Sequence, residues 1–186
     1  MRPEDRYDSL LRYYADKYGV PFGLLKRQML AESGADPGAV SPSGARGLLQ
    51  FLPATWAQFD DDDPIPALND PHNAEEAIEA GARYMAYLYA RFDEIPDPIE
   101  RWRFALASYN AGRGHINRAL ERARRALGLP GPYSEWVQAG RPAGAWQTWA
   151  FTSQYLREIT GAHAAETLGY VARIAGAHGE PAWEAG

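Results

Sequence analysis

Glu32 is the residue whose surroundings first suggest chemistry. It closes a segment with helical periodicity and precedes a loop, residues 33–47, that is rich in Gly, Ala, Ser and Pro. Steps of 100° per residue place Leu25 and Met29 on one apolar stripe, with Glu32 at its edge. Burial beside such a stripe keeps a carboxyl protonated near neutrality, which suits a general acid. Stripe position alone favours the other interpretation, a half-exposed edge glutamate.

The loop after Glu32 has the composition of a shaped binding surface. Its small residues let the backbone approach a ligand closely, and Ser41 and Gln50 are polar groups that can return towards Glu32 and orient it. The alternative is an ordinary surface loop, which is how most stretches of Gly, Pro and Ser are read.

Helices must position these residues. Pro21 suits the start of a helix and Gly34 its end. Asn73 and Glu76 have the spacing of a capping box, and Pro98 begins another helix. The sequence predicts helices over 7–18, 21–33, 73–92, 98–110 and 116–127, and two more between 148 and 178. No segment alternates convincingly, so we expect a mainly α fold of about six to eight helices; a small β-hairpin near Phe51 is left open.

Composition excludes several classes of protein. The 186 residues fit one compact domain. A net charge of −5 argues against nucleic-acid binding, and the absence of Cys excludes disulfides and thiolate metal sites. No run approaches the roughly 20 apolar residues of a membrane span. We therefore expect no membrane insertion and no nucleic-acid partner.

Metal and cofactor sites are not predicted. The acidic run Asp60–Asp63 lacks the spaced ligands of a calcium loop and is predicted to be a solvated turn. The histidines show no zinc-binding spacing; they are His72, His115, His163 and His178.

Three segments, in order, resemble the motifs of the soluble lytic transglycosylases, lysozyme-like enzymes that cleave peptidoglycan. They read "ESGADPGAVSPSGARGLLQFLPATW", "ALASYNAG" and "AETLGYV" and run from Glu32 to Val171. The resemblance implies a lysozyme-like fold and reverses the preference for Glu32 as a plain edge residue. The first segment departs from the family at Leu49 and Leu52, where Met is frequent; the similar volume keeps a groove apolar.

The resemblance also implies roles for particular residues. Glu32 matches the family's sole catalytic acid/base, and the other matches are expected to bind substrate. They are Ser41, Gln50, Leu52, Tyr109, Asn110, Glu166 and Tyr170. In the family the equivalent of Tyr109 bonds the catalytic carboxyl. The stretch between the second and third segments is long for the family, which weakens the match of Glu166.

The expected reaction uses Glu32 twice. It first protonates the oxygen between N-acetylmuramic acid and N-acetylglucosamine, then takes the proton of the C6 hydroxyl as a 1,6-anhydro ring closes. Hydrolysis by a muramidase is the alternative and requires a second carboxylate, Asp36 or Glu166. Asp36 is expected instead to cap N–H groups of its own loop. A non-catalytic glycan-binding or assembly module is the alternative from another class.

Aromatic and basic residues leave further choices open. Trp136, Trp146 and Trp149 are candidates to stack on sugars, although core positions suit them equally well, whereas Trp56 and Trp102 are expected in the core. Three arginines lie on one face of the 116–127 helix: Arg118, Arg122 and Arg125. Such a face is either simply exposed to solvent or attracts anionic polymers of the cell envelope.

The predicted organisation is an N-terminal helical segment over 1–20, a lysozyme-like catalytic domain over 21–178 and a loose tail over 179–186. We expect a monomer without cofactor whose partner is peptidoglycan. The first residues lack the pattern of a secretory signal. A wall-cleaving domain without such a signal predicts a bacteriophage endolysin released through a holin, or a virion lysin. Such a protein is made in the cytoplasm and acts on the wall, in the periplasm or outside. The alternatives are an accessory enzyme of a secretion system and a recombinant domain that lost its signal.

Overall fold

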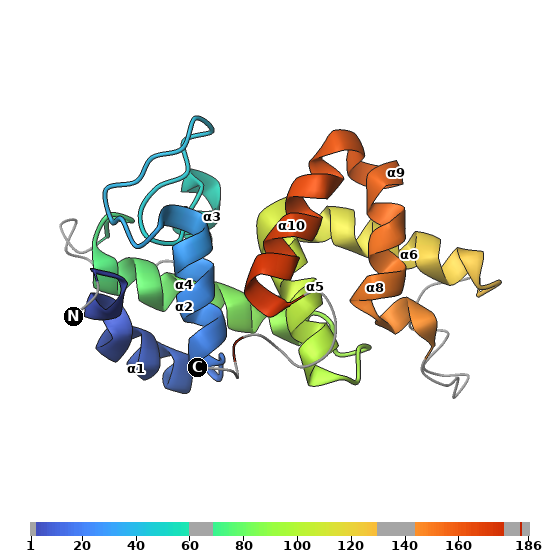
Figure 1. Ribbon diagram of the computed structural model, residues 1–186, viewed down its shortest axis with the longest axis horizontal. Helices are drawn as coiled ribbons and strands as arrows, with labels where there is room; N and C mark the ends of the chain where they lie inside the picture. The colour runs from blue at the N-terminus through green and yellow to red at the C-terminus, as the bar shows by residue number, and fades with distance from the viewer. Residues whose placement is uncertain (1–2, 60–68, 130–143, 177–182, 184–186) are drawn as a thin grey trace. The chain divides into compact units, whose positions relative to one another are not determined.

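The computed structural model describes residues 3–59, 69–129, 144–176 and 183 of the chain (Figure 1). The predicted mainly α fold is confirmed. The α-helices are α1 (Asp8–Tyr18), α2 (Phe22–Ser33), α3 (Pro53–Phe59), α4 (Ala74–Ala90), α5 (Pro98–Ala111), α6 (Arg113–Ala126), α8 (Trp149–Thr152), α9 (Leu156–Thr160) and α10 (Ala164–Ala175). Short 3₁₀ turns join them: η1 (Pro3–Tyr7), η2 (Ala145–Gln147), η3 (Ser153–Tyr155) and η4 (Gly161–His163).

The chain divides into two compact units. Unit 1 comprises Met1–Tyr87 and Ala182–Gly186, and unit 2 comprises Leu88–Pro181. The predicted boundaries at residues 20 and 178 stay predictions. Each unit is described by itself below.

In unit 1, α2 forms where the sequence predicts a helix. Gly34 ends α2 with φ 64°, a left-handed conformation that glycine adopts without steric cost. The buried face includes Leu25 and Met29, as predicted, and also Leu24 and Gln28. Helix α1 packs against α2, so the N-terminal residues and the segment that carries Glu32 share one core.

Helix α4 is tied to α1 by polar side chains. Its first turn is capped by Asn73, whose side-chain oxygen accepts from the backbone N–H groups of Glu75 and Glu76. The Tyr14 hydroxyl donates to Glu75 over 2.9 Å. Glu79, one turn further on, accepts from Lys17 and Tyr18, each over 2.6 Å. These bonds fix α4 against α1 while its apolar residues enter the core.

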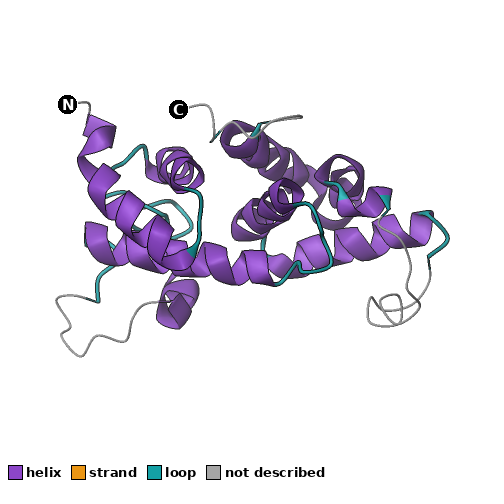
Figure 2. Ribbon diagram, turned by 90° about the horizontal axis from the view of Figure 1, so that it is seen from below, coloured by secondary structure: helices purple, strands orange, loops and turns teal. Residues whose placement is uncertain are grey.

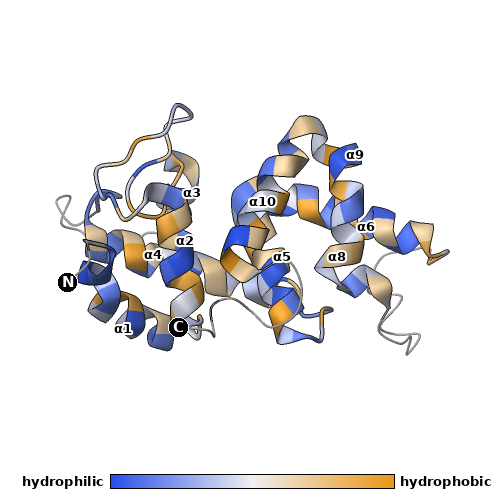
Figure 3. Ribbon diagram, in the orientation of Figure 1, coloured by the Kyte–Doolittle hydropathy of each residue, from blue (hydrophilic) through white to orange (hydrophobic). Residues whose placement is uncertain are grey.

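In unit 2, α5 packs against both α6 and α10. The side chain of Asp97 accepts from the N–H groups of Ile99 and Glu100, which caps α5 immediately before Pro98. Helix α6 is amphipathic: hydrophilic and hydrophobic residues alternate along it in Figure 3, and Ile116, Leu120 and Ala123 are buried. The helix predicted over 116–127 therefore forms and buries one face.

Among the described residues no strand occurs, and Figure 2 shows these residues as helices and loops only. The small β-hairpin that the sequence allows near Phe51 does not form among these residues. That region has two isolated antiparallel bridges, Val40 with Arg46 and Arg46 with Phe51. No described helix is long and apolar enough to cross a bilayer.

Candidate active site

Glu32 lies in the last turn of α2 and is half-buried. It follows Leu25, Gln28 and Met29 at helical spacing, so it continues the buried face of α2 to the helix end. The neighbouring hydroxyl of Ser33 donates to the carbonyl of Leu48 over 2.8 Å. This bond joins the helix end to the far side of the following loop and holds the backbone at Glu32 in place.

Ser41 and Gln50 stabilise that loop from within. The Gln50 amide donates to the carbonyls of Ala39 and Gly47, over 3.2 and 3.0 Å. The Ser41 hydroxyl accepts from the N–H of Ala45 over 3.0 Å. These contacts give both residues a part in shaping the loop, whereas the sequence predicted that they orient Glu32 directly. That direct role stays a prediction.

The loop is also anchored to the segment that leads into α4. Gly47 lies so close to the carbonyl of Pro71 that a Cβ there would be 1.7 Å from the oxygen. The His72 ring is 2.9 Å from the carbonyl of Pro37. A Cβ on Gly81 of α4 would meet the side chain of Leu49 at 1.8 Å, so Leu49 fills the notch that this glycine leaves. The loop therefore has a defined shape.

Two loop residues bear on the expected chemistry. Leu52 is 46% exposed and offers apolar surface immediately before α3, and its substrate-binding role stays a prediction. Asp36 accepts from the N–H of Gly38 over 2.8 Å. The prediction that Asp36 caps its own loop is confirmed.

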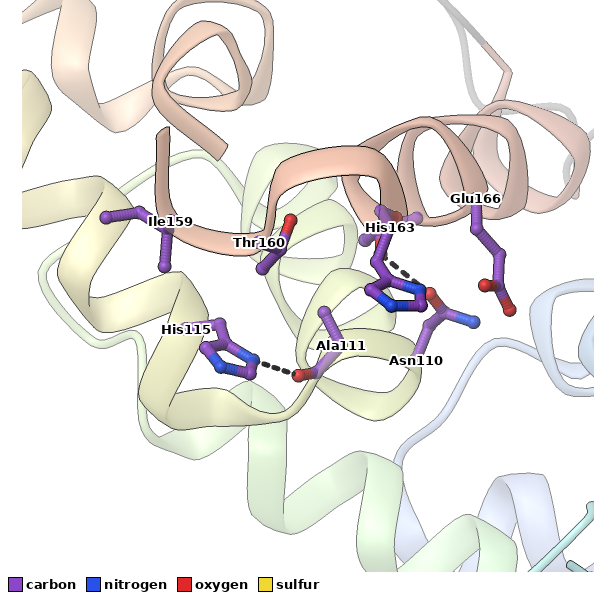
Figure 4. Close-up of a pocket in the computed structure, with 8 residues that line it drawn as sticks. Asn110, Ala111, His115, Ile159, Thr160, His163 and Glu166 are labelled. Atoms are coloured by element: carbon purple, nitrogen blue, oxygen red, sulfur yellow. Dashed lines mark hydrogen bonds between the residues drawn. The ribbon is translucent and has the colours of Figure 1, made fainter. Parts of the chain in front are cut away.

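Unit 2 contains a pocket of about 430 Å³ between the end of α5 and the start of α10 (Figure 4). Its walls combine amide, imidazole, hydroxyl and carboxylate groups with two aliphatic side chains. The residues are Asn110, Ala111, His115, Ile159, Thr160, His163, Glu166 and Thr167. This mixture suits a small polar ligand or part of a larger one, such as a sugar ring.

Asn110 and Glu166, predicted from separate segments, come together in this pocket. The Asn110 side-chain oxygen accepts from the Thr167 hydroxyl over 2.8 Å. His115 Nδ1 lies 2.6 Å from the carbonyl of Ala111, and because a carbonyl oxygen can only accept, this ring nitrogen carries a proton and donates. The pocket thus offers amide N–H groups together with a carboxylate.

The other predicted residues of unit 2 contribute less surface. Tyr109 is half-buried at the end of α5, beside Asn110. Tyr170 is 2% exposed in α10, which leaves little of its ring for a ligand. Sequence reasoning missed His115, His163 and Thr167 as pocket residues. Only Thr167, inside the third segment next to Glu166, carried a signal that could have found it.

The tryptophans that the structure describes occupy the core. Trp146 and Trp149 are 1% and 6% exposed, so the core alternative holds for both, and the core predictions for Trp56 and Trp102 are confirmed. Trp136 and Asp60–Asp63 lie outside the described residues. Among the residues that are described, no three His, Asp or Glu side chains are grouped to hold a metal ion.

On the arginine face of α6, two of three side chains have acidic partners. Arg122 and Arg125 pair with Glu158 and Glu121. Both pairs neutralise charge, which favours the solvated-face interpretation over attraction to anionic polymers.

Comparison with known proteins identifies relatives. The profile of the transglycosylase SLT domain matches residues 9–128. Membrane-bound lytic murein transglycosylase F of Marinobacter nauticus is 43% identical over 122 residues, which is 65% of this chain and 23% of the relative. The protein of that name from Desulfosudis oleivorans is 36% identical over 119 residues, 64% of this chain and 25% of the relative. The chain thus spans about a quarter of the length of these relatives.

Solved structures agree with these matches. The 70 kDa soluble lytic transglycosylase of Escherichia coli superposes on this chain with a TM-score of 0.58 and a sequence identity of 26%. The superposition covers 93% of this chain and 23% of the Escherichia coli protein. The lytic transglycosylase Slt of Pseudomonas aeruginosa, at 19% identity and a TM-score of 0.59, covers 90% of this chain and 23% of its own and supports the fold alone.

Proposed function

Because the chain belongs to the transglycosylase SLT domain family, we propose that it is a peptidoglycan lytic transglycosylase with Glu32 as its acid/base. The observation that carries the proposal is the placement of Glu32 at the end of the buried face of α2, inside the segment that the family profile matches. The substrate is the glycan strand of peptidoglycan, since the relatives are named murein transglycosylases.

In the proposed reaction Glu32 acts twice. As an acid it gives its proton to the glycosidic oxygen, and the bond from that oxygen to C1 of N-acetylmuramic acid breaks. The substrate's own acetamide group stabilises the positive charge that develops at C1. As a base, the carboxylate then removes the proton from the C6 hydroxyl, whose oxygen bonds to C1 and closes the 1,6-anhydro ring. Glu32 ends protonated, and no water is consumed.

The environment of Asp36 argues against this residue as the second carboxylate of a hydrolase. A hydrolysing muramidase needs a second carboxylate as base or nucleophile. Asp36 lies four residues beyond Glu32, but it is exposed and bonded to the N–H of Gly38. A carboxylate that holds its own loop together is poorly suited to that role.

Substrate contacts are proposed for both units. In unit 1 they come from Ser41, Gln50 and Leu52, on the loop after α2 and at the start of α3. In unit 2 they come from Asn110 and Glu166 in the pocket. Tyr109 and Tyr170 do not line that pocket, and their roles stay predictions from the sequence. Glu166 and Tyr170 lie beyond the residues that the family profile matches. Glu166 lines the pocket, whereas Tyr170 does not, so the assignment of Tyr170 rests on the sequence resemblance alone.

The decisive experiment replaces Glu32 by Gln, which keeps shape and hydrogen bonding but cannot cycle a proton. We expect release of muropeptides from purified peptidoglycan to fall at least about a thousandfold. Mass spectrometry of the wild-type digest should find 1,6-anhydro products. Undiminished release by Glu32→Gln, or a digest with reducing-end products only, contradicts the proposal.

Asp36→Asn is the matched control, because asparagine preserves the acceptor that bonds Gly38 N–H. Its activity should stay within about twofold of wild type, as for a surface change away from special features. A loss as large as that of Glu32→Gln would instead identify Asp36 as a second catalytic carboxylate. The bacteriophage setting and the monomeric state stay predictions from the sequence.

A further inference from the structure

Asn110 reaches the pocket of unit 2 with one end of its amide already engaged. The Oδ1 atom lies 2.8 Å from the Thr167 hydroxyl, and Thr167 is itself only 2% exposed (Figure 4). An asparagine amide presents an acceptor at one end and two N–H donors at the other. Whichever end bonds Thr167 decides what the pocket offers to a ligand.

The single proton of the Thr167 hydroxyl settles that orientation. A helical threonine usually donates to the carbonyl four residues earlier, which here is that of His163. That carbonyl is 3.5 Å away, whereas Asn110 Oδ1 is at 2.8 Å, the ordinary distance for an O–H···O bond. The hydroxyl therefore donates to Asn110, which must present its oxygen to Thr167 and its N–H groups elsewhere.

We propose that Thr167 is a positioning residue for substrate binding, which fixes the Asn110 amide so that its N–H groups face the pocket beside Glu166. The proposal rests on the proposed function and deepens it. Asn110 then donates to a carbonyl or hydroxyl oxygen of the glycan, and Glu166 accepts from a hydroxyl or amide N–H of the same sugar. Without the Thr167 hydroxyl the amide rotates freely, and half of its orientations present the wrong end.

The test compares two substitutions at this position. Thr167→Val keeps the shape but lacks the hydroxyl, and Thr167→Ser keeps the hydroxyl. With peptidoglycan as substrate, Thr167→Val should raise KM about three- to tenfold, the effect of one hydrogen bond, with kcat within about twofold. Thr167→Ser should restore most of the affinity. Equal KM values for wild type and Thr167→Val, or an equal defect in Thr167→Ser, would overturn the proposal.

Thr152→Val is the matched control in the same unit. The Thr152 hydroxyl is also buried and donates to the carbonyl of Trp146 over 2.6 Å, but it lies outside the pocket. This variant should melt at a lower temperature with KM unchanged. If Thr152→Val raises KM as much as Thr167→Val, the defect at Thr167 is one of general stability and the positioning role is refuted.

A double-mutant cycle separates positioning from direct contact. In an Asn110→Ala background, adding Thr167→Val should cause no further rise in KM, because no amide remains to be oriented. Additive effects overturn the proposal.

A binding measurement keeps this inference apart from the proposed reaction. Calorimetric titration of the full chain with N-acetylglucosamine oligomers needs no turnover, and it should give a weaker Kd for Thr167→Val than for Thr167→Ser. If the wild type releases no anhydro products, the proposed function fails while this comparison still decides the role of Thr167. Equal Kd values for the two variants refute the positioning role even in an active enzyme.

Discussion

At the scale of single residues, Gly47 determines whether the loop after Glu32 can close. It has φ 73°, and its Cα approaches the carbonyl of Pro71 closely. Gly44, in the same loop, has φ 82°, but no atom lies within 4 Å of the position that a Cβ would take. A side chain at Gly44 would therefore cost only the strain of the left-handed backbone. A side chain at Gly47 would cost that strain and a steric clash with Pro71 as well.

We predict that Gly44→Ala lowers the free energy of unfolding by about 1 to 2 kcal/mol, the strain of a left-handed alanine. Gly47→Ala should cost at least about 3 kcal/mol, since the Pro71 backbone must also move. Urea unfolding followed by circular dichroism measures both. Equal losses for the two variants would show that the contact between Gly47 and Pro71 does not anchor the loop.

Residue types alone predicted Glu32 at a helix end and Asp36 as a cap, because both features depend on neighbours within a few positions. The position of His115 was not predictable in this way, and that of Thr167 was indicated only by its place beside Glu166 in the third segment. Their importance comes from the packing of α10 and α6 against α5, which joins residues 57 positions apart in the case of Thr167 and Asn110. Local sequence patterns carry no information about such contacts.

At the scale of elements, Glu79 links α1 to α4. Its carboxylate is partly buried, which by itself raises its pKa, but the hydrogen bonds from Lys17 and Tyr18 outweigh burial and leave the pKa below its usual range. Folding therefore favours the ionised form. The stabilisation is complete above the pKa of an unfolded glutamate, about 4.3, and is lost as the pH falls through the lower pKa of the folded state.

We predict that wild-type stability falls more steeply than that of Glu79→Gln as the pH is lowered from about 5 to 3, because glutamine has no charge to lose. Thermal melts at half-unit pH steps measure the two slopes. Glu158→Gln is the control, since its partnership with Arg122 is about half-exposed at both ends and contributes little. Parallel curves for wild type and Glu79→Gln would contradict the assigned link.

The helices themselves were largely predictable, because periodicity and capping residues act over one or two turns. Gly34 ends α2, Asn73 caps α4 and Asp97 caps α5, as local signals indicate. Gln28 was not predictable: the apolar stripe left it out, yet it is fully buried. Whether Trp146 and Trp149 are buried or exposed was not predictable either, because it depends on which helices pack around them.

At the scale of the whole molecule, the chain does not finish in the unit where its last helix lies. Helix α10 belongs to unit 2, whereas Ala182–Gly186 belongs to unit 1. Trp183 is 7% exposed and lies against Gly23 of α2, where a Cβ would be 2.3 Å from the Trp183 carbonyl oxygen. The predicted loose tail otherwise lies outside the described residues. The backbone of Trp183 thus returns the chain to the helix that carries Glu32.

We predict that Trp183→Ala lowers the free energy of unfolding by about 2 to 4 kcal/mol, because loss of a buried indole leaves a cavity in unit 1. Trp183→Phe should recover about half of the loss, since it keeps an aromatic ring in the same place. Both variants should stay active at low temperature, because Trp183 takes no part in the proposed proton transfer. Limited proteolysis followed by mass spectrometry should find the first new cleavages of Trp183→Ala in unit 1. First cleavages in unit 2, or an unchanged melting temperature, would show that Trp183 does not stabilise the N-terminal unit.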